Sequence, residues 1–174
     1  RYQDEMISEI ESIKKNEKFG IRLLADAILV SGYSMTMLNG ETSPSSGSEH
    51  IISHFFDYQH EVYQLPKNLH GTQVGLGTII MSTAYDLLRD MKASDFDIDS
   101  ILKRRPSEKF IKSEHQRVFG DDAGIFDTVM ERKRISDQDY PAYLKMIIDG
   151  WDDLWNALSP FLMPSDKIRE VMDQ

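Results

Sequence analysis

The chain is organised around residues 40–71, which read GETSPSSGSEHIISHFFDYQHEVYQLPKNLHG. The first part of this stretch is rich in Thr, Ser, Pro and Gly, a composition typical of a loop. A helix is predicted to begin within SSGSEH and to carry His50 and His54. Because four residues make about one helical turn, the two imidazoles should lie on one face, about 6 Å apart along the axis. His70 stands beside Gly71 at the predicted start of another helix.

Three of the five histidines therefore fall within residues 50–70. Two histidines at this spacing on a helix can bind one metal ion, but the Glu of the specific HExxH motif is absent. Judged by spacing alone, the same histidines could be hydrogen-bonded residues of a helical core. The residues by themselves leave both interpretations open.

A family resemblance rests on two segments, SGYSMTMLNGETSPSSGSEHIISHFFD and LHGTQVGLGTIIMSTAYD. Together they resemble the helical domain of sn-glycerol-1-phosphate dehydrogenases, within the superfamily of iron-type alcohol dehydrogenases, glycerol dehydrogenases and 3-dehydroquinate synthases. The resemblance is dense over residues 24–86 and looser towards the C-terminus. It implies an NAD(P)-dependent oxidoreductase of phospholipid biosynthesis that reduces dihydroxyacetone phosphate to sn-glycerol 1-phosphate.

The same resemblance implies roles for the three histidines. In that family an aspartate and two histidines hold one divalent metal, which makes His50 and His70 the expected metal ligands here. His54 is expected to be catalytic, facing the nicotinamide and the substrate. We expect zinc, with iron and nickel as alternatives, because nitrogen and carboxylate ligands accept all three metals. Glu49 and Asp57 flank the histidines and are candidates for orienting an imidazole.

Two departures from the family pattern bear on the site. The aspartate ligand lies upstream of the matching stretch in the family, so we expect the third ligand outside this chain. Ser43 stands where glycerol-phosphate enzymes often carry an arginine before the loop proline. Serine can offer only a neutral hydrogen bond, which weakens the case for a phosphorylated substrate without removing it.

Composition excludes several classes of function. The 174 residues include 20 basic and 29 acidic side chains, and the resulting net charge of −9 argues against nucleic-acid and anionic-membrane surfaces. Without cysteine, a metal site must use nitrogen and oxygen ligands. No uninterrupted apolar run approaches the ~20 residues needed to span a bilayer, and no signal-peptide h-region is evident, so a cytoplasmic location is expected. The expected partners are a small-molecule substrate and the protein's own N-terminal domain; homo-oligomerisation stays open.

Helical periodicity runs through the whole chain. We predict an all-α fold, a single helical-bundle domain of about eight helices over residues 1–174. The family resemblance implies that this domain is like the α domain of dehydroquinate synthase. The apolar segment 19–38 is predicted to be a buried central helix. In the predicted helix 70–92, Gly75 and Gly77 should permit close helix packing. Trp151 and Trp155 are predicted core or interface residues.

No nucleotide-binding βαβ pattern is found. Enzymes of the superfamily that this chain resembles carry an N-terminal α/β nucleotide-binding domain. The resemblance therefore implies that this chain is the C-terminal, metal-binding domain of a longer enzyme, with NAD(P) bound by the N-terminal domain and no activity expected in residues 1–174 alone. Two alternatives stay open. One is a 3-dehydroquinate synthase-like lyase, and the other is a helical interaction domain whose histidines bind no metal.

Overall fold

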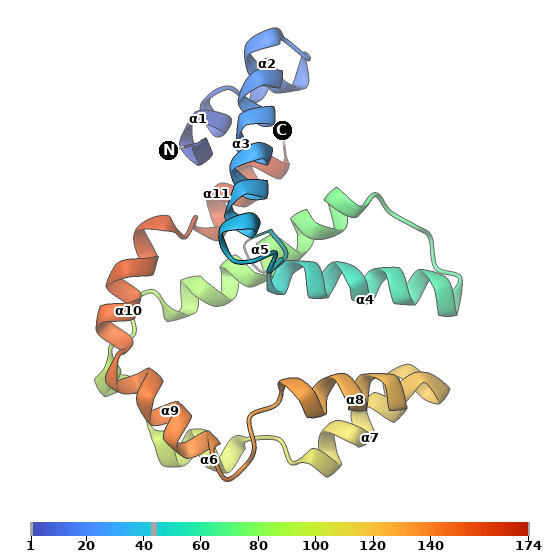
Figure 1. The fold of residues 1–174 in the computed structure, drawn as a ribbon, viewed down its shortest axis with the longest axis vertical. Coiled ribbons are helices and arrows are strands. Elements are labelled where there is room, and N and C mark those ends of the chain that lie inside the picture. Colours follow the sequence, from blue (N-terminus) through green and yellow to red (C-terminus); the bar gives the residue numbers. More distant parts are fainter. Residues whose placement is uncertain (1, 43–44, 174) are drawn as a thin grey trace. The chain divides into compact units, whose positions relative to one another are not determined.

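The fold was analysed in a computed structural model that describes residues 2–42 and 45–173. These residues form eleven α-helices and three short 3-10 helices and contain no strand, which confirms the predicted all-α class (Figure 1). The sequence predicts one bundle of about eight helices. The described helices cluster into two compact units. Within the described ranges, no helix is long and apolar enough to cross a membrane.

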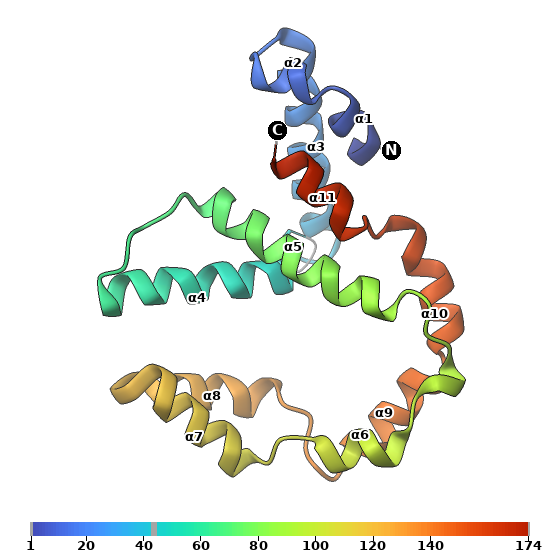
Figure 2. The same ribbon diagram turned by 180° about the vertical axis from the view of Figure 1, so that it is seen from behind.

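Unit 1 contains the described residues up to Leu88 and those from Phe161 onward. Two short N-terminal helices pack on the long helix α3, while α4 and the C-terminal helix α11 both pack on α5 (Figures 1 and 2). The helices of this unit are α1 (Tyr2–Ser8), α2 (Ile10–Lys14), α3 (Lys18–Met37), α4 (Ser48–Tyr63), α5 (His70–Leu88) and α11 (Ser165–Met172).

Helices α4 and α5 lie side by side and antiparallel, joined by the connection that follows Gln64 (Figures 1 and 2). Gly77 makes their close approach possible, because a Cβ atom built there would lie 2.5 Å from the Glu49 carbonyl oxygen. At Gly75 a Cβ would lie 2.8 Å from the Met172 Cε atom of α11, which is the flexible end of a side chain and can move away. The predicted role in close helix packing is confirmed for Gly77.

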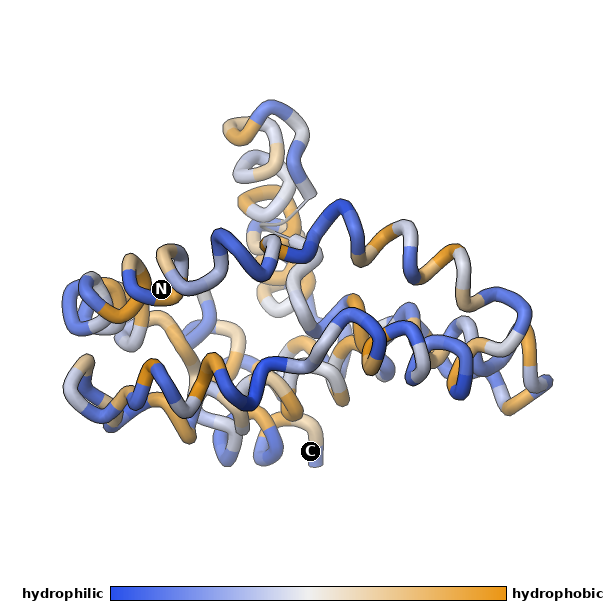
Figure 3. Tube along the Cα trace, turned by 90° about the horizontal axis from the view of Figure 1, so that it is seen from below, coloured by the Kyte–Doolittle hydropathy of each residue, from blue (hydrophilic) through white to orange (hydrophobic). Residues whose placement is uncertain are grey.

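Helix α3 forms as predicted, but its predicted burial is wrong. Only Gly20 and Leu23 of this helix are buried, whereas Ile28, Tyr33 and Met37 expose 63%, 70% and 83% of their surface. The buried part is where α2 approaches so closely that a Cβ on Gly20 would lie 2.5 Å from the Ile13 nitrogen. Apolar and polar residues alternate along the helices (Figure 3), but apolar composition alone does not determine which face a neighbouring helix covers.

Unit 2 comprises Arg89–Pro160. Its core includes Trp151 and Trp155, each only 8% exposed, with indole rings stacked at 5.4 Å. Their Nε1 atoms donate 2.9 Å hydrogen bonds to the carbonyls of Met91 and Arg89, beyond the end of α5. The predicted core role of both tryptophans is confirmed. The helical elements within this unit are η1 (Ala93–Asp95), α6 (Ile98–Arg104), α7 (Glu108–Phe119), η2 (Gly120–Asp122), α8 (Ala123–Lys133), α9 (Tyr140–Asp149) and α10 (Trp151–Leu158).

Candidate metal centre

The three histidines singled out in the sequence lie together where α4 crosses α5. His50 and His54 occupy successive turns of α4, and His70 is the first residue of α5. The ring centroids of His50 and His70 are 5.3 Å apart, and those of His54 and His70 are 6.2 Å apart. The packing of α5 against α4 thus brings His70 next to His50 and His54, which helical spacing places on one face of α4.

His50 is oriented by the residue that precedes it. The Glu49 Oε1 atom accepts hydrogen bonds of 2.8 Å from His50 Nδ1 and 2.8 Å from the Gly47 backbone nitrogen. An ionised carboxylate can only accept, so the proton of a neutral His50 imidazole lies on Nδ1 and the Nε2 lone pair is available.

The electrostatics of Glu49 favour its ionised form. Partial burial of this carboxyl opposes ionisation, but the hydrogen bonds from His50 and from the backbone outweigh burial and hold the pKa of Glu49 below its ordinary value of 4.5. A negative charge is therefore maintained behind the His50 ring at neutral pH. Such a charge raises the basicity of a ligand nitrogen on the far side of the ring.

His70 is held by two residues that the sequence analysis did not identify. The Ser53 hydroxyl lies 3.0 Å from His70 Nδ1 and donates a 2.9 Å hydrogen bond to Gln73 Oε1. Ser53 has no exposed surface, and Gln73 is only 4% exposed. The one feature of the sequence that points to Ser53 is its position between His50 and His54 on the same predicted helix.

His54, like His70, is exposed, whereas His50 is only partly exposed. The His54 side chain is 68% exposed, and its Nδ1 atom lies 3.8 Å from Asp57 Oδ2, one helical turn further along. Of the two flanking carboxylates, Glu49 therefore contacts His50 directly, while Asp57 lies beside His54. The exposed His54 ring is accessible to a ligand in solution.

The residues present fit a divalent metal with nitrogen ligands. Two imidazoles on one tetrahedral ion, with metal–nitrogen distances of about 2.0–2.1 Å, have ring centroids roughly 5 Å apart. The 5.3 Å between His50 and His70 matches that spacing. In the described ranges, no group of three or more His, Cys, Asp or Glu side chains is placed to hold a metal. The pair would therefore need a further ligand to form a complete centre.

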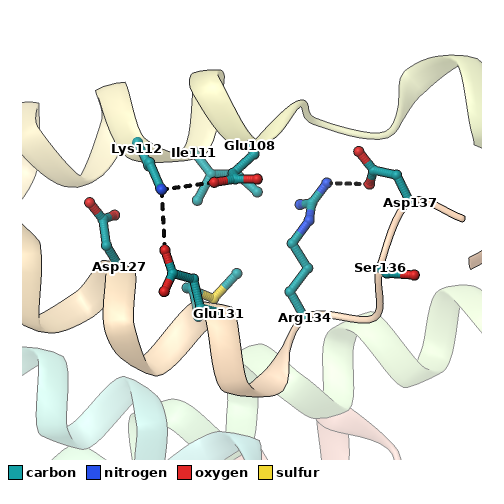
Figure 4. A pocket seen from close by; sticks show the side chains of 9 residues that line it. Glu108, Ile111, Lys112, Asp127, Glu131, Arg134, Ser136 and Asp137 are labelled. Atoms are coloured by element: carbon teal, nitrogen blue, oxygen red, sulfur yellow. Dashed lines mark hydrogen bonds and ion pairs between the residues drawn. The ribbon is translucent and has the colours of Figure 1, made fainter. Parts of the chain in front are cut away.

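A pocket of about 410 Å³ in unit 2 is the main competing site (Figure 4). Its charged side chains already have partners. Lys112 Nζ lies 2.7 Å from Glu108 and 3.2 Å from Glu131, and Arg134 lies 2.9 Å from Asp137. Asp127 Oδ1 lies 2.6 Å from His115 Nδ1. These pairs leave no convergent set of free donors or acceptors for a ligand. The pocket is therefore a weaker candidate than the histidine cluster.

Together, the fold and the cluster define a class: an all-α unit with a candidate divalent-metal site at an antiparallel helix crossing. The chain is similar to proteins named glycerol-1-phosphate dehydrogenase (NAD(P)+). One from Saccharolobus islandicus is 35% identical over 124 residues, covering 63% of this chain and 34% of that protein. One from Sulfurisphaera tokodaii is 41% identical over 70 residues, or 40% of this chain and 19% of that protein. One from Bacillus subtilis is 35% identical over 79 residues, or 45% and 20%.

These matches confirm the resemblance to glycerol-1-phosphate dehydrogenases over 63% of this chain. The chain spans about a third of the length of the curated relatives it matches first. No family model matches the sequence. No solved structure matches it either.

Proposed function

We propose that this chain is the metal- and substrate-binding helical domain of an NAD(P)-dependent glycerol-1-phosphate dehydrogenase-like oxidoreductase. The proposed reaction is the reduction of dihydroxyacetone phosphate to sn-glycerol 1-phosphate. The names of the relatives support the reaction class. The observation that carries the proposal is the 5.3 Å distance between the ring centroids of His50 and His70. Each ring also has its Nδ1 atom within hydrogen-bonding distance of a protein side chain, Glu49 for His50 and Ser53 for His70.

In this proposal His50 and His70 hold a divalent metal, zinc in our prediction, through their Nε2 atoms. A bound ion of this kind polarises the substrate oxygen and stabilises an alkoxide. Glu49 fixes the orientation of the His50 ring and adds negative charge behind it. His54, exposed beside the pair, contacts the substrate on the nicotinamide side. The third metal ligand and the NAD(P) site come from residues outside this chain.

Recognition of the substrate's phosphate is the part of the proposal that depends on Ser43. Ser43, which stands where relatives of this kind often carry arginine, lies outside the described residues. Loss of one charge-assisted hydrogen bond to a phosphate costs about 1.5–3 kcal/mol, roughly ten- to a hundred-fold in affinity. We propose that other groups hold the phosphate, so that Ser43→Arg changes the preference between glycerol 1-phosphate and glycerol only slightly.

The proposal is tested by assaying the full-length protein that contains this chain with dihydroxyacetone phosphate, glycerol 1-phosphate and glycerol. We expect NAD(P)H-dependent reduction of dihydroxyacetone phosphate. We also expect kcat/KM for glycerol 1-phosphate to exceed that for glycerol by about ten- to a hundred-fold or more. Equal kcat/KM for glycerol and glycerol 1-phosphate would contradict the proposed substrate.

A further inference from the structure

We infer that Ser53 is a positioning residue that sets the tautomer of His70. Its hydroxyl, fixed by Gln73, holds the imidazole proton on Nδ1 and leaves the Nε2 lone pair free. The inference rests on the proposed function in one respect only, because the freed nitrogen is the proposed metal ligand. The tautomer itself is a property of the metal-free chain.

The burial of Ser53 makes its hydrogen bonds obligatory. This side chain has no exposed surface, so water cannot satisfy its hydroxyl. An unpaired hydroxyl in such a place is costly, and buried polar groups are accordingly hydrogen-bonded. The two partners within reach are His70 Nδ1 at 3.0 Å and Gln73 Oε1 at 2.9 Å, both on α5.

The single proton of the hydroxyl decides the direction of this chain of bonds. A serine hydroxyl has one proton to donate and lone pairs that can accept. Ser53 donates its proton to Gln73 Oε1. Towards His70 it can then only accept, so the His70 Nδ1 atom must carry the hydrogen. The neutral imidazole therefore has its free lone pair on Nε2.

The same arrangement holds His50 by different chemistry. There the acceptor for the Nδ1 proton is the Glu49 carboxylate, while at His70 it is a neutral hydroxyl. Both rings consequently keep Nδ1 turned to the protein and Nε2 available. Partners of this kind typically change metal affinity 10- to 100-fold when they are removed.

A purely structural role for Ser53 has to be separated from this one. A small residue is needed where α4 and α5 cross, so loss of stability in a variant would not distinguish the two roles. Two variants test the bond chain. Ser53→Ala removes the acceptor for the His70 proton. Gln73→Leu removes the acceptor for the Ser53 proton, which frees that proton for His70 Nδ1 without touching the ring.

The experiment measures the imidazole nitrogens by long-range proton–nitrogen NMR in the metal-free chain, labelled with 15N at histidine, at pH 8. The His70 signals are assigned with a His70→Gln variant. We expect His70 to carry its proton on Nδ1 in the unmodified chain and to shift towards the Nε2-protonated form in Ser53→Ala and Gln73→Leu. Ser82→Ala is the matched control, because Ser82 is also a buried serine, 7% exposed, on α5. It should leave the tautomer unchanged.

Zinc titrations of the full-length protein and its variants supply the second readout. We expect Ser53→Ala and Gln73→Leu to weaken zinc binding about 10- to 100-fold, with Ser82→Ala within about two-fold of the unmodified protein. A His70 proton on Nε2 in the unmodified chain, or an unchanged tautomer in both variants, would overturn the inference. If the unmodified protein binds no zinc while His70 keeps its Nδ1 proton through Ser53, the proposed metal site fails and the assignment of Ser53 stands.

Discussion

At the scale of single residues, the chemistry of the cluster depends on which imidazole nitrogen is free. A neutral histidine offers one lone pair, and the partner of the other nitrogen decides where it lies. For His50 that partner is Glu49, whose carboxylate also accepts the Gly47 backbone N–H. The Glu49 carboxylate therefore hydrogen-bonds both the backbone at the start of α4 and the His50 ring.

Glu49→Gln should weaken metal binding without preventing folding. The amide removes the negative charge behind the His50 ring and can accept only through one oxygen. We expect the zinc affinity of the full-length protein to fall about 10- to 100-fold, measured by competition with a chromophoric chelator. Glu61→Gln makes the same change at a side chain on α4 that is 72% exposed, and should leave zinc affinity unchanged. Equal zinc affinities for both variants would show that Glu49 does not contribute to zinc binding.

How far the sequence predicts the cluster depends on distance along the chain. Helical spacing puts His50 and His54 on one face, and the family resemblance adds His70. Ser53 and Gln73 were missed because their roles depend on the crossing of two helices that are joined by a loop. A buried serine and a glutamine 20 residues apart carry no local pattern that distinguishes them from ordinary helix residues.

At the scale of helices, the crossing of α4 and α5 positions the site. The two backbones come close at Gly77, where an added Cβ would lie 2.5 Å from a backbone oxygen of α4. Backbone cannot turn away as a flexible side chain can, so the helices themselves would have to shift. The proton-holding contacts of Ser53 lie four residues along α4 from this point and depend on the same separation.

Gly77→Ala should therefore destabilise unit 1 by about 1–3 kcal/mol, the usual cost of overpacking. Gly32→Ala is the matched control, because a Cβ at Gly32 of α3 would meet no atom within 4 Å. The control should stabilise the chain by about 0.5–1 kcal/mol, since alanine is the better helix former. Urea unfolding followed by circular dichroism measures both changes. A stabilising Gly77→Ala would show that the helices have room to separate.

A cluster in unit 2 predicts a pH dependence. Asp137 lies 2.9 Å from Arg134 and 3.0 Å from Arg105. The Arg134 hydrogen bond first, and then the charges of Arg134 and Arg105, hold the pKa of Asp137 below its ordinary value of 3.8. Because the folded state favours the ionised form, this carboxylate stabilises folding above its unfolded-state pKa. That contribution is lost as pH falls through the lower folded-state pKa.

Asp137→Asn should thus lower the unfolding free energy at pH 7, and its difference from the unmodified chain should shrink as the pH falls below about 4. The Asp137 side chain is 69% exposed, so solvent screens the effect and the change should be small. Asp149→Asn, which breaks one exposed pair with Lys145, is the comparison. Urea unfolding between pH 3 and 7 provides the measurement. A difference for Asp137→Asn that grows as the pH falls would contradict the assignment.

The burial of α3 and the C-terminal end of α5 could not be predicted from sequence periodicity. Periodicity predicts α3 closely, yet most of its apolar residues are exposed, because burial depends on which helices pack against it. Helix α5 ends at Leu88, four residues before the predicted Lys92. The Arg89 carbonyl accepts a hydrogen bond from Trp155, 66 residues further along the chain. The Met91 carbonyl accepts one from Trp151, 60 residues further along. Such long-range partners leave no trace in a local pattern.

At the scale of the whole molecule, every residue of the candidate centre belongs to unit 1. The three histidines and the residues that orient His50 and His70 therefore all lie within one compact unit. The relatives match this chain over about a third of their own length. The proposed reaction requires a further metal ligand and a cofactor site in addition to this histidine pair.

The central claim is that His50 and His70 together hold the metal on which turnover depends. The most direct measurement is the bound-metal content of the full-length protein, by inductively coupled plasma mass spectrometry, alongside dihydroxyacetone phosphate reduction. The control is His60→Ala on the same helix, since His60 Nδ1 bonds only the nearby Leu65 carbonyl among the contacts described. We expect His50→Ala and His70→Ala each to lose stoichiometric metal and turnover, while His60→Ala keeps both. Stoichiometric metal and undiminished turnover in either His50→Ala or His70→Ala would contradict this claim.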